Sequence, residues 1–105
     1  MRFLIVTKGR DPLPPEMAIG MLQMFQGWLA EHRGSGKLEQ AWSFAGQPAG
    51  GGIANVDSLE ELDAMMATWP LSQTSEIAVY PLADLDAVLE TSLANIQGIM
   101  EAMNT

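Results

Sequence analysis

The sequence predicts an α+β fold with a four-stranded antiparallel sheet. Four short segments have the apolar runs or the two-residue alternation of strands, and three longer segments have apolar residues at helical spacing. Their order along the 105 residues is strand, helix, strand, strand, helix, strand and a final helix. In the split βαβ arrangement that has this order, the first two helices cover one face of the sheet.

The first half of the chain is expected to form two strands and a long helix. Residues 2–8 contain an apolar run that suits a strand buried on both faces. Pro14 and Pro15 fit the first turn of the next helix, and Gly34 follows its end near residue 33. The apolar stripe of this helix comprises Met17, Met21, Met24, Phe25, Trp28, Leu29 and His32. Residues 37–45 alternate as a strand does, which places on one face Leu38, Gln40, Trp42 and Phe44.

The second half is expected to add two strands and two helices. Residues 53–56 form a short strand, and Ser58 with Glu61 has the spacing of a capping box that opens a helix. The stripe of this helix, which Pro70 stops, comprises Leu59, Leu62, Met66 and Trp69. The last strand spans residues 75–81. Asp84 then caps a helix over about residues 84–103 with the stripe Leu85, Val88, Leu89, Ser92, Ile96, Ile99 and Met103.

These elements make a ferredoxin-like βαββαβ unit with an added C-terminal helix, in a single domain of residues 1–105. The sheet face without helices is expected to carry small residues, among them Ala41, Ser43, Ala45 and Ala78. An uncovered apolar face needs a partner. The sequence therefore predicts a homodimer or higher homo-oligomer in which sheet packs on sheet, a dimeric α+β barrel.

Composition argues against several functional classes. Five basic and thirteen acidic residues give a net charge of −8, so neither a nucleic acid nor a membrane is an expected partner. The chain has no cysteine, which excludes disulfides and thiolate metal sites, and no metal site is expected. The N-terminal apolar run is far shorter than the roughly 20 residues of a spanning helix. The expected location is the cytoplasm.

The stretch GQPAGGG at residues 46–52 raises the question of a phosphate-binding loop. Such a loop needs a helix behind it, whose N-terminal amides bind the anion, whereas a strand follows here. We interpret the stretch as a hairpin turn that leads into a glycine-rich strand. Glycines are tolerated in strands where a ligand or another backbone approaches closely.

Four short motifs have a characteristic joint spacing: W-S-F-A-G at 42–46, I-A-N-V-D-S-L-E-E-L at 53–62, W-P-L at 69–71 and E-I-A-V at 76–79. Together they resemble the muconolactone isomerase family, without gaps over residues 36–79. The resemblance implies small ferredoxin-like subunits that assemble into oligomers. It also implies cofactor-free proton transfer that moves a double bond within a lactone ring.

Three positions depart from the pattern of that family. Ser43 stands where the family has a basic residue, and Gln47-Pro48 stands where it has His-Tyr. Residues 72–74 replace a segment rich in aromatic residues. The resemblance therefore implies the fold more strongly than the family's own reaction, and a relative with a different substrate.

Proton transfer at carbon needs a base and a group that stabilises the enolate oxygen. The candidate catalytic residues are His32, the only histidine, and Tyr80, which can polarise a carbonyl. Their simpler interpretations are a histidine favoured by a helix C-terminus and a tyrosine in a structural hydrogen bond. The predicted substrate pocket, between the first helix and the strand of Trp42, comprises Trp28, Gln40, Trp42, Phe44 and Trp69. The alternative for its aromatic residues is a place in the packed core.

The predicted function is that of a cofactor-independent isomerase or cyclase acting on a small hydrophobic lactone or enolisable carbonyl compound. It requires a cavity in which His32 and Trp42 converge. The alternative is a non-catalytic small-molecule-binding or assembly module with the same fold, which the missing basic residues favour. A heme- or oxygen-handling role rests on analogy of fold alone.

Overall fold

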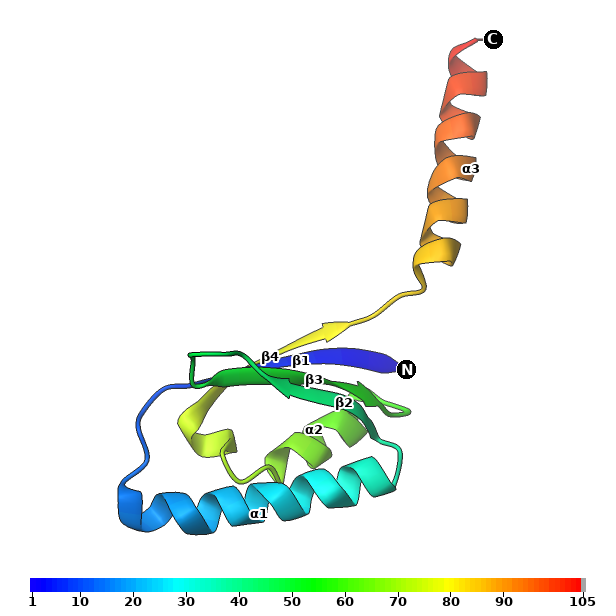
Figure 1. The fold of residues 1–105 in the computed structure, drawn as a ribbon. Helices are drawn as coiled ribbons and strands as arrows, with labels where there is room; N and C mark the ends of the chain where they lie inside the picture. Colours follow the sequence, from blue (N-terminus) through cyan, green and yellow to red (C-terminus); the bar gives the residue numbers. More distant parts are fainter. Residues whose placement is uncertain (105) are drawn as a thin grey trace.

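The computed structural model describes residues 1–104 and has the predicted α+β architecture (Figure 1). Strands β1 (Arg2–Gly9), β2 (Leu38–Ser43), β3 (Ala49–Asn55) and β4 (Ser75–Pro81) form an antiparallel sheet in the order β2-β3-β1-β4. Helices α1 (Pro15–Gly34) and α2 (Leu59–Ala67) cover one face of the sheet. A 3-10 turn, η1 (Ser72–Thr74), joins α2 to β4, and helix α3 (Leu85–Met103) follows β4. The ferredoxin-like order is confirmed.

Side-chain caps fix the starts of the second and third helices where the sequence predicts them. Ser58 Oγ accepts a hydrogen bond of 3.1 Å from the Glu61 N–H. Glu61 Oε2 accepts one of 2.9 Å from the Asp57 N–H, so this pair satisfies two backbone donors at the start of α2. Asp84 Oδ2 accepts a hydrogen bond of 3.0 Å from the Ala87 N–H at the start of α3.

The core lies between the sheet and its two covering helices. It comprises Phe3, Ile5, Trp28, Leu38, Ala54, Val56, Leu62, Met65, Met66 and Trp69. The two central strands of the sheet are β3 and β1. From β1, the buried side chains of Phe3 and Ile5 point toward the helices. Removal of these side chains from water is the main favourable contribution to folding.

A β-bulge in β2 changes the face on which its side chains lie. Leu38 pairs with Ala54, and Gln40 pairs with Ile53, the adjacent residue of the antiparallel strand β3. Glu39 is therefore the extra residue of the bulge. Leu38 therefore belongs to the helix-covered face, whereas Gln40 and Trp42 belong to the opposite, helix-free face. The prediction that these three side chains share a face is wrong, because strict alternation takes no account of a bulge.

The pairing register assigns the remaining side chains to the two faces. The helix-covered face contains the rows Ser43–Gly50–Thr7–Ile77 and Ala41–Gly52–Ile5–Val79. The helix-free face contains the rows Trp42–Gly51–Val6–Ala78 and Gln40–Ile53–Leu4–Tyr80. The helix-free face thus has the apolar character that the sequence predicts, but Ala41 and Ser43 lie on the other face.

The glycine stretch divides between a turn and a strand, as we interpreted it. Gly46 has a φ of 75° in the turn between β2 and β3, a left-handed conformation that favours glycine. Strand β3 begins at Ala49, earlier than predicted, so three consecutive glycines lie inside it. A β-carbon on Gly51 would lie 3.2 Å from Nε1 of Trp42, so the indole ring lies directly against the backbone at Gly51.

Helix α3 projects away from the sheet, and the molecule measures 72 × 28 × 22 Å (Figure 1). Every described residue of α3 is exposed. Its large apolar side chains fall on one side of the helix and are Leu85, Val88, Leu89, Leu93, Ile96, Ile99, Met100 and Met103. Among residues 1–104, no helix is long and apolar enough to cross a membrane.

We expect Gly51→Ala to lower the free energy of unfolding by about 1–3 kcal/mol, because its β-carbon would lie only 2.5 Å from the carbonyl oxygen of Ile5. Gly27→Ala is the matched control. Gly27 lies within α1 with nothing near its missing β-carbon, so the same change should raise stability by about 0.5–1 kcal/mol. Urea unfolding at one fixed protein concentration measures both, and equal effects would contradict the close approach at Gly51.

Candidate functional site

A cavity of about 710 Å³ lies between α1 and the helix-covered face of the sheet. We call it the sheet cavity. Its floor consists of side chains and backbone from β1, β2 and β3: Ile5, Thr7, Ala41, Ser43, Gly50 and Gly52. Since Gly50 and Gly52 have no side chains and Ala41 has only a methyl group, little on this floor fills the space beneath the helix.

Aromatic side chains form the wall of the sheet cavity on the helical side. Phe25 and Trp69 meet edge to face, with ring centroids 5.6 Å apart and an angle of 80°. Phe25 meets Trp28 at 6.2 Å and 69°. Trp28 Nε1 donates to Thr68 Oγ1 at 3.1 Å and to the Met65 carbonyl oxygen at 3.3 Å. These hydrogen bonds hold the Trp28 ring against α2, so the wall has a fixed geometry.

Two hydroxyl groups flank Gly50 on the floor of the sheet cavity. Thr7 and Ser43 are its cross-strand neighbours on either side. Thr7 Oγ1 donates to the Gly50 carbonyl oxygen at 3.4 Å, and Ser43 Oγ donates to the Ala49 carbonyl oxygen at 3.5 Å. Both bonds are long, hence weak, so either hydroxyl can turn to donate to a ligand oxygen at small cost.

Charge is sparse around the sheet cavity. Of the described residues that line it, only Asp11 and Arg33 are charged, and both side chains are exposed. Asp11 lies between β1 and α1, and Arg33 lies in the last turn of α1. The charges are therefore at the rim, near opposite ends of a 20-residue helix.

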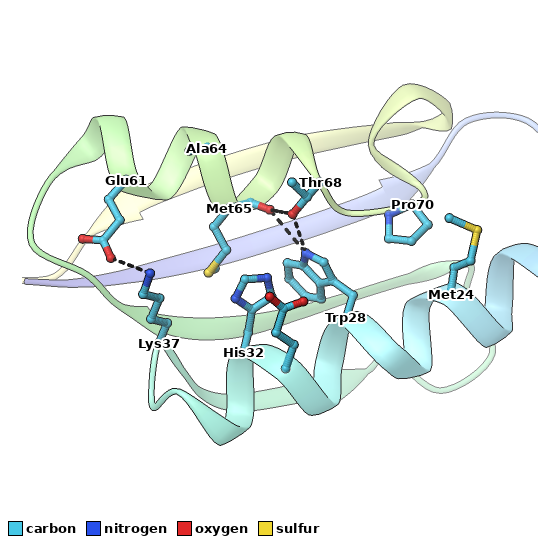
Figure 2. A pocket seen from close by; sticks show the side chains of 10 residues that line it. Met24, Trp28, His32, Lys37, Glu61, Ala64, Met65, Thr68 and Pro70 are labelled. Carbon is cyan, nitrogen blue, oxygen red and sulfur yellow. Dashed lines mark hydrogen bonds and ion pairs between the residues drawn. The ribbon is translucent and has the colours of Figure 1, made fainter.

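A second cavity, of about 490 Å³, lies between α1 and α2 (Figure 2). We call it the interhelical cavity. It is lined by Met24, Trp28, Glu31, His32, Lys37, Glu61, Ala64, Met65, Thr68 and Pro70. Trp28 lines both cavities, and the His32 ring packs against it with centroids 4.6 Å apart. Trp28 therefore stands between His32 and the sheet cavity.

An ion pair closes one end of the interhelical cavity (Figure 2). Lys37 Nζ lies 3.0 Å from Glu61 Oε1. The pKa of Glu61 is lowered, first by the hydrogen bond from the Asp57 N–H and then by that from Lys37. The carboxylate is thus engaged on both oxygens by the fold itself, which suits a structural role.

The structure distributes the predicted site residues over three places. Trp28, Trp42 and Trp69 contribute to the lining of the sheet cavity. Trp42 does so from the edge strand β2, although its side chain belongs by register to the helix-free face. His32 lines the interhelical cavity, so the expected convergence of His32 and Trp42 in one cavity is not found. The three other candidates line neither described cavity: Gln40 and Tyr80 on the helix-free face, and Phe44, which is 38% exposed.

Sequence reasoning missed the two hydroxyls on the cavity floor. Thr7 interrupts the apolar run of the first strand, and that break was a usable signal. Ser43 differs from the basic residue that the resemblance implies, but nothing in the alternation assigns its side chain to the helix-covered face, which depends on the bulge at Glu39.

Comparison of this sequence with models of known protein families identifies its family. The sequence model described as muconolactone delta-isomerase matches residues 1–87. The chain belongs to the muconolactone delta-isomerase family. The match ends near the start of α3, so the family pattern covers the sheet and both covering helices. A comparison with curated proteins gives no match.

Two solved structures have a similar fold. The crystal structure of muconolactone isomerase aligns with a TM-score of 0.74 and 22% identity, over 80% of this chain and 90% of that chain. The 5-chloro-2-hydroxyhydroquinone dehydrochlorinase from Burkholderia phenoliruptrix AC1100, solved with 2,5-dihydroxybenzoquinone, aligns with a TM-score of 0.66 and 15% identity, over 83% of this chain and 98% of that chain. These similarities confirm the fold of the muconolactone delta-isomerase family in this chain.

The lowered pKa of Glu61 predicts how its contribution to stability depends on pH. A carboxyl group whose pKa falls on folding stabilises the fold above its unfolded-state pKa of about 4.3, and this stabilisation is lost as the pH falls through the lowered value. We therefore expect Glu61→Ala to be less stable than the wild type at pH 7, with a difference that shrinks as the pH is lowered below 4. Urea unfolding of both proteins across this range measures it. A constant difference would contradict an ionised Glu61 as the source.

Proposed function

We propose that this protein is a cofactor-independent isomerase or cyclase that acts by proton transfer on a small hydrophobic lactone or another enolisable carbonyl compound. The observation that carries the proposal is the sheet cavity, an apolar space with two hydroxyl groups on its floor, in a member of the muconolactone delta-isomerase family. The small cyclic compounds named with the two similar structures support a ligand of this general kind.

The reaction needs only a proton that leaves one carbon and returns to another. Removal of a proton from carbon next to a carbonyl group, or conjugated with it, gives an enolate. In the proposed mechanism the hydroxyl of Thr7 or that of Ser43 donates a hydrogen bond to the enolate oxygen and stabilises its negative charge. Return of the proton to a different carbon shifts the double bond, so the product has the same atoms as the substrate.

Asp11 is the proposed base, since it is the one carboxylate among the described residues that line the sheet cavity. The two candidates from the sequence imply other sites. His32 can serve as the base only for a ligand in the interhelical cavity, because Trp28 separates it from the sheet cavity. Tyr80 lies on the helix-free face, where it can meet a substrate only if a second subunit encloses that face.

Proton NMR of muconolactone in D₂O, with catalytic amounts of protein, tests this proposal. We expect protein-dependent exchange of ring protons or appearance of the enol-lactone. Asp11→Asn should slow the exchange by about 100-fold or more, as expected for loss of a general base. His32→Gln and Tyr80→Phe are the matched comparisons and should stay within a few-fold of wild type.

Each variant that breaks this pattern identifies a different site. Loss of exchange in His32→Gln, with Asp11→Asn active, would move the reaction to the interhelical cavity. Loss in Tyr80→Phe alone would move it to the helix-free face. A wild-type spectrum without exchange would remove the family's own reaction from this protein.

We further propose that the protein is a homodimer or higher homo-oligomer. Two apolar surfaces support this: the helix-free face, with Leu4, Val6, Ile53 and Trp42, and the exposed side of α3. A second copy offers each of these surfaces a partner, since both occur in every chain. This arrangement also supports the alternative function, an assembly module of the same fold without catalysis.

Substitutions on opposite sides of α3 test the oligomer. The double variant Leu89→Glu with Ile96→Glu places two charges on the apolar side and should lower the mass measured by size-exclusion chromatography with light scattering. Ala87→Glu with Ala94→Glu adds the same charge at the same seven-residue spacing on the opposite side and should leave that mass unchanged. A wild-type protein with the mass of one chain would contradict the proposal directly.

A further inference from the structure

The shape of the sheet cavity follows α1 along most of its length. Six residues of α1 line it, three or four residues apart except for one adjacent pair: Ala18, Leu22, Phe25, Trp28, Leu29 and Arg33. At a rise of 1.5 Å per residue, the distance from Ala18 to Arg33 along the helix axis is about 22 Å. The cavity is therefore long, while its floor is the flat backbone of the glycine-rich strand.

The volume exceeds what a single-ring lactone fills. A cavity of about 710 Å³ falls in the range that encloses drug-sized ligands, which is roughly 300–1,000 Å³. A ligand with one small ring would leave most of this apolar space to water. Phe25, Trp28 and Trp69 instead offer an aromatic wall several rings wide.

The charges around the sheet cavity oppose an anionic ligand. The protein carries a net charge of −8, and its five basic residues are placed unfavourably for a carboxylate in the cavity. Arg2 pairs with Glu39, Lys37 pairs with Glu61, and Arg10 Nη2 donates to the Gln73 carbonyl oxygen at 2.9 Å. Lys8 belongs by register to the helix-free face.

Arg33 is the remaining cation, and it lies exposed at the rim of the sheet cavity. Within the described residues, no buried side-chain nitrogen or oxygen lacks a hydrogen-bond partner. No unpaired buried polar group is therefore free to stabilise the charge of a buried carboxylate. A carboxylate that entered the cavity would give up its hydration without an ionic partner inside, which is costly.

We propose that the sheet cavity binds a neutral, flat carbonyl compound of two or three fused rings. The inference rests on the proposed function for the choice of this site, and it names the class of substrate. The ring system lies between the aromatic wall and the backbone of Gly50 and Gly52. Its carbonyl oxygen accepts a hydrogen bond from Thr7 or from Ser43, which lie on either side of Gly50.

Equilibrium binding of four probe compounds to the full-length protein tests this inference. The probes are 1-tetralone (neutral, two fused rings), 1-naphthoate (anionic, two fused rings), muconolactone (anionic, one ring) and decan-2-one (neutral, no ring). Quenching of tryptophan fluorescence or titration calorimetry gives each dissociation constant. We expect 1-tetralone to bind about tenfold or more tightly than each other probe, because burial of a carboxylate is unfavourable and only fused rings match the aromatic wall.

Two variants place the bound 1-tetralone in the sheet cavity. Ala41→Leu raises the floor and Ala18→Leu narrows one end, and each should weaken its binding by about tenfold. Ala30→Leu makes the same change on an exposed position of α1 that lines neither described cavity, and it should leave binding unchanged. Circular dichroism verifies that each variant is folded. If one of the two cavity variants does not fold, the other still tests the position of the bound 1-tetralone.

The outcomes for this inference differ from those for the proposed function. Tighter binding of 1-naphthoate, muconolactone or decan-2-one than of 1-tetralone would overturn the inference, even if muconolactone exchanged its protons. Unchanged binding of 1-tetralone in both cavity variants would overturn it as well. Selective binding of 1-tetralone without deuterium exchange at its α-carbon would support the class of ligand and contradict catalysis.

Discussion

The missing side chains of Gly50, Gly51 and Gly52 are the constraint on which the site depends. Strand β3 lies between β1 and β2, so a bulky residue there would project into the middle of the sheet on one face or the other. Gly50 and Gly52 leave the space beneath α1 open, and Gly51 lets the Trp42 indole lie against the opposite face. Each strand glycine costs about 0.5–1 kcal/mol relative to alanine. Hydrogen-bonded ladders to both neighbouring strands offset this cost.

The Trp28 ring separates two cavities that differ in their polar groups. Its ring forms part of both linings, and its Nε1 is held by Thr68 and Met65 at the end of α2. The imidazole of His32, the ammonium group of Lys37 and the carboxylates of Glu31 and Glu61 line the interhelical cavity. The sheet cavity has hydroxyls and aromatic rings, with the charges of Asp11 and Arg33 at its rim. Ser43, at the position where the resemblance to the family implies a basic residue, lies on the cavity floor beside Gly50. The departure noted in the sequence thus coincides with a change in the chemistry of the cavity.

Much of the architecture was predictable because it depends on local signals. The capping pair at Ser58, the cap at Asp84 and the order of elements all have short-range causes, and the structure agrees with them. The sheet face on which the Trp42 side chain lies was not predictable. A single bulged residue inverts the alternation of the strand, and the hydrophobic pattern gives no signal of that bulge. The early start of β3 was missed because glycine has low strand propensity, which pairing on both sides overrides.

The sequence also could not show that the apolar side chains of α1 are shared between the two cavities. The periodicity correctly groups Phe25, Trp28, Leu29 and His32 on one side of the helix. It gives no sign that Phe25 and Leu29 border the sheet cavity while His32 borders the cavity next to α2. That partition depends on where α2 lies, which is a long-range property of the fold.

The outward course of α3 has a consequence for the order of folding. The sheet and its two helices close through contacts among residues that precede α3, so they can form in a first-order step. The nineteen residues of α3 have no buried position in their own chain, whereas most helices in proteins owe their stability to packing of an apolar face. If a second chain stabilises α3, the helical content of α3 depends on protein concentration and falls on dilution, while the sheet remains intact. The sheet and its two covering helices would then form first, and the contact between subunits would form last.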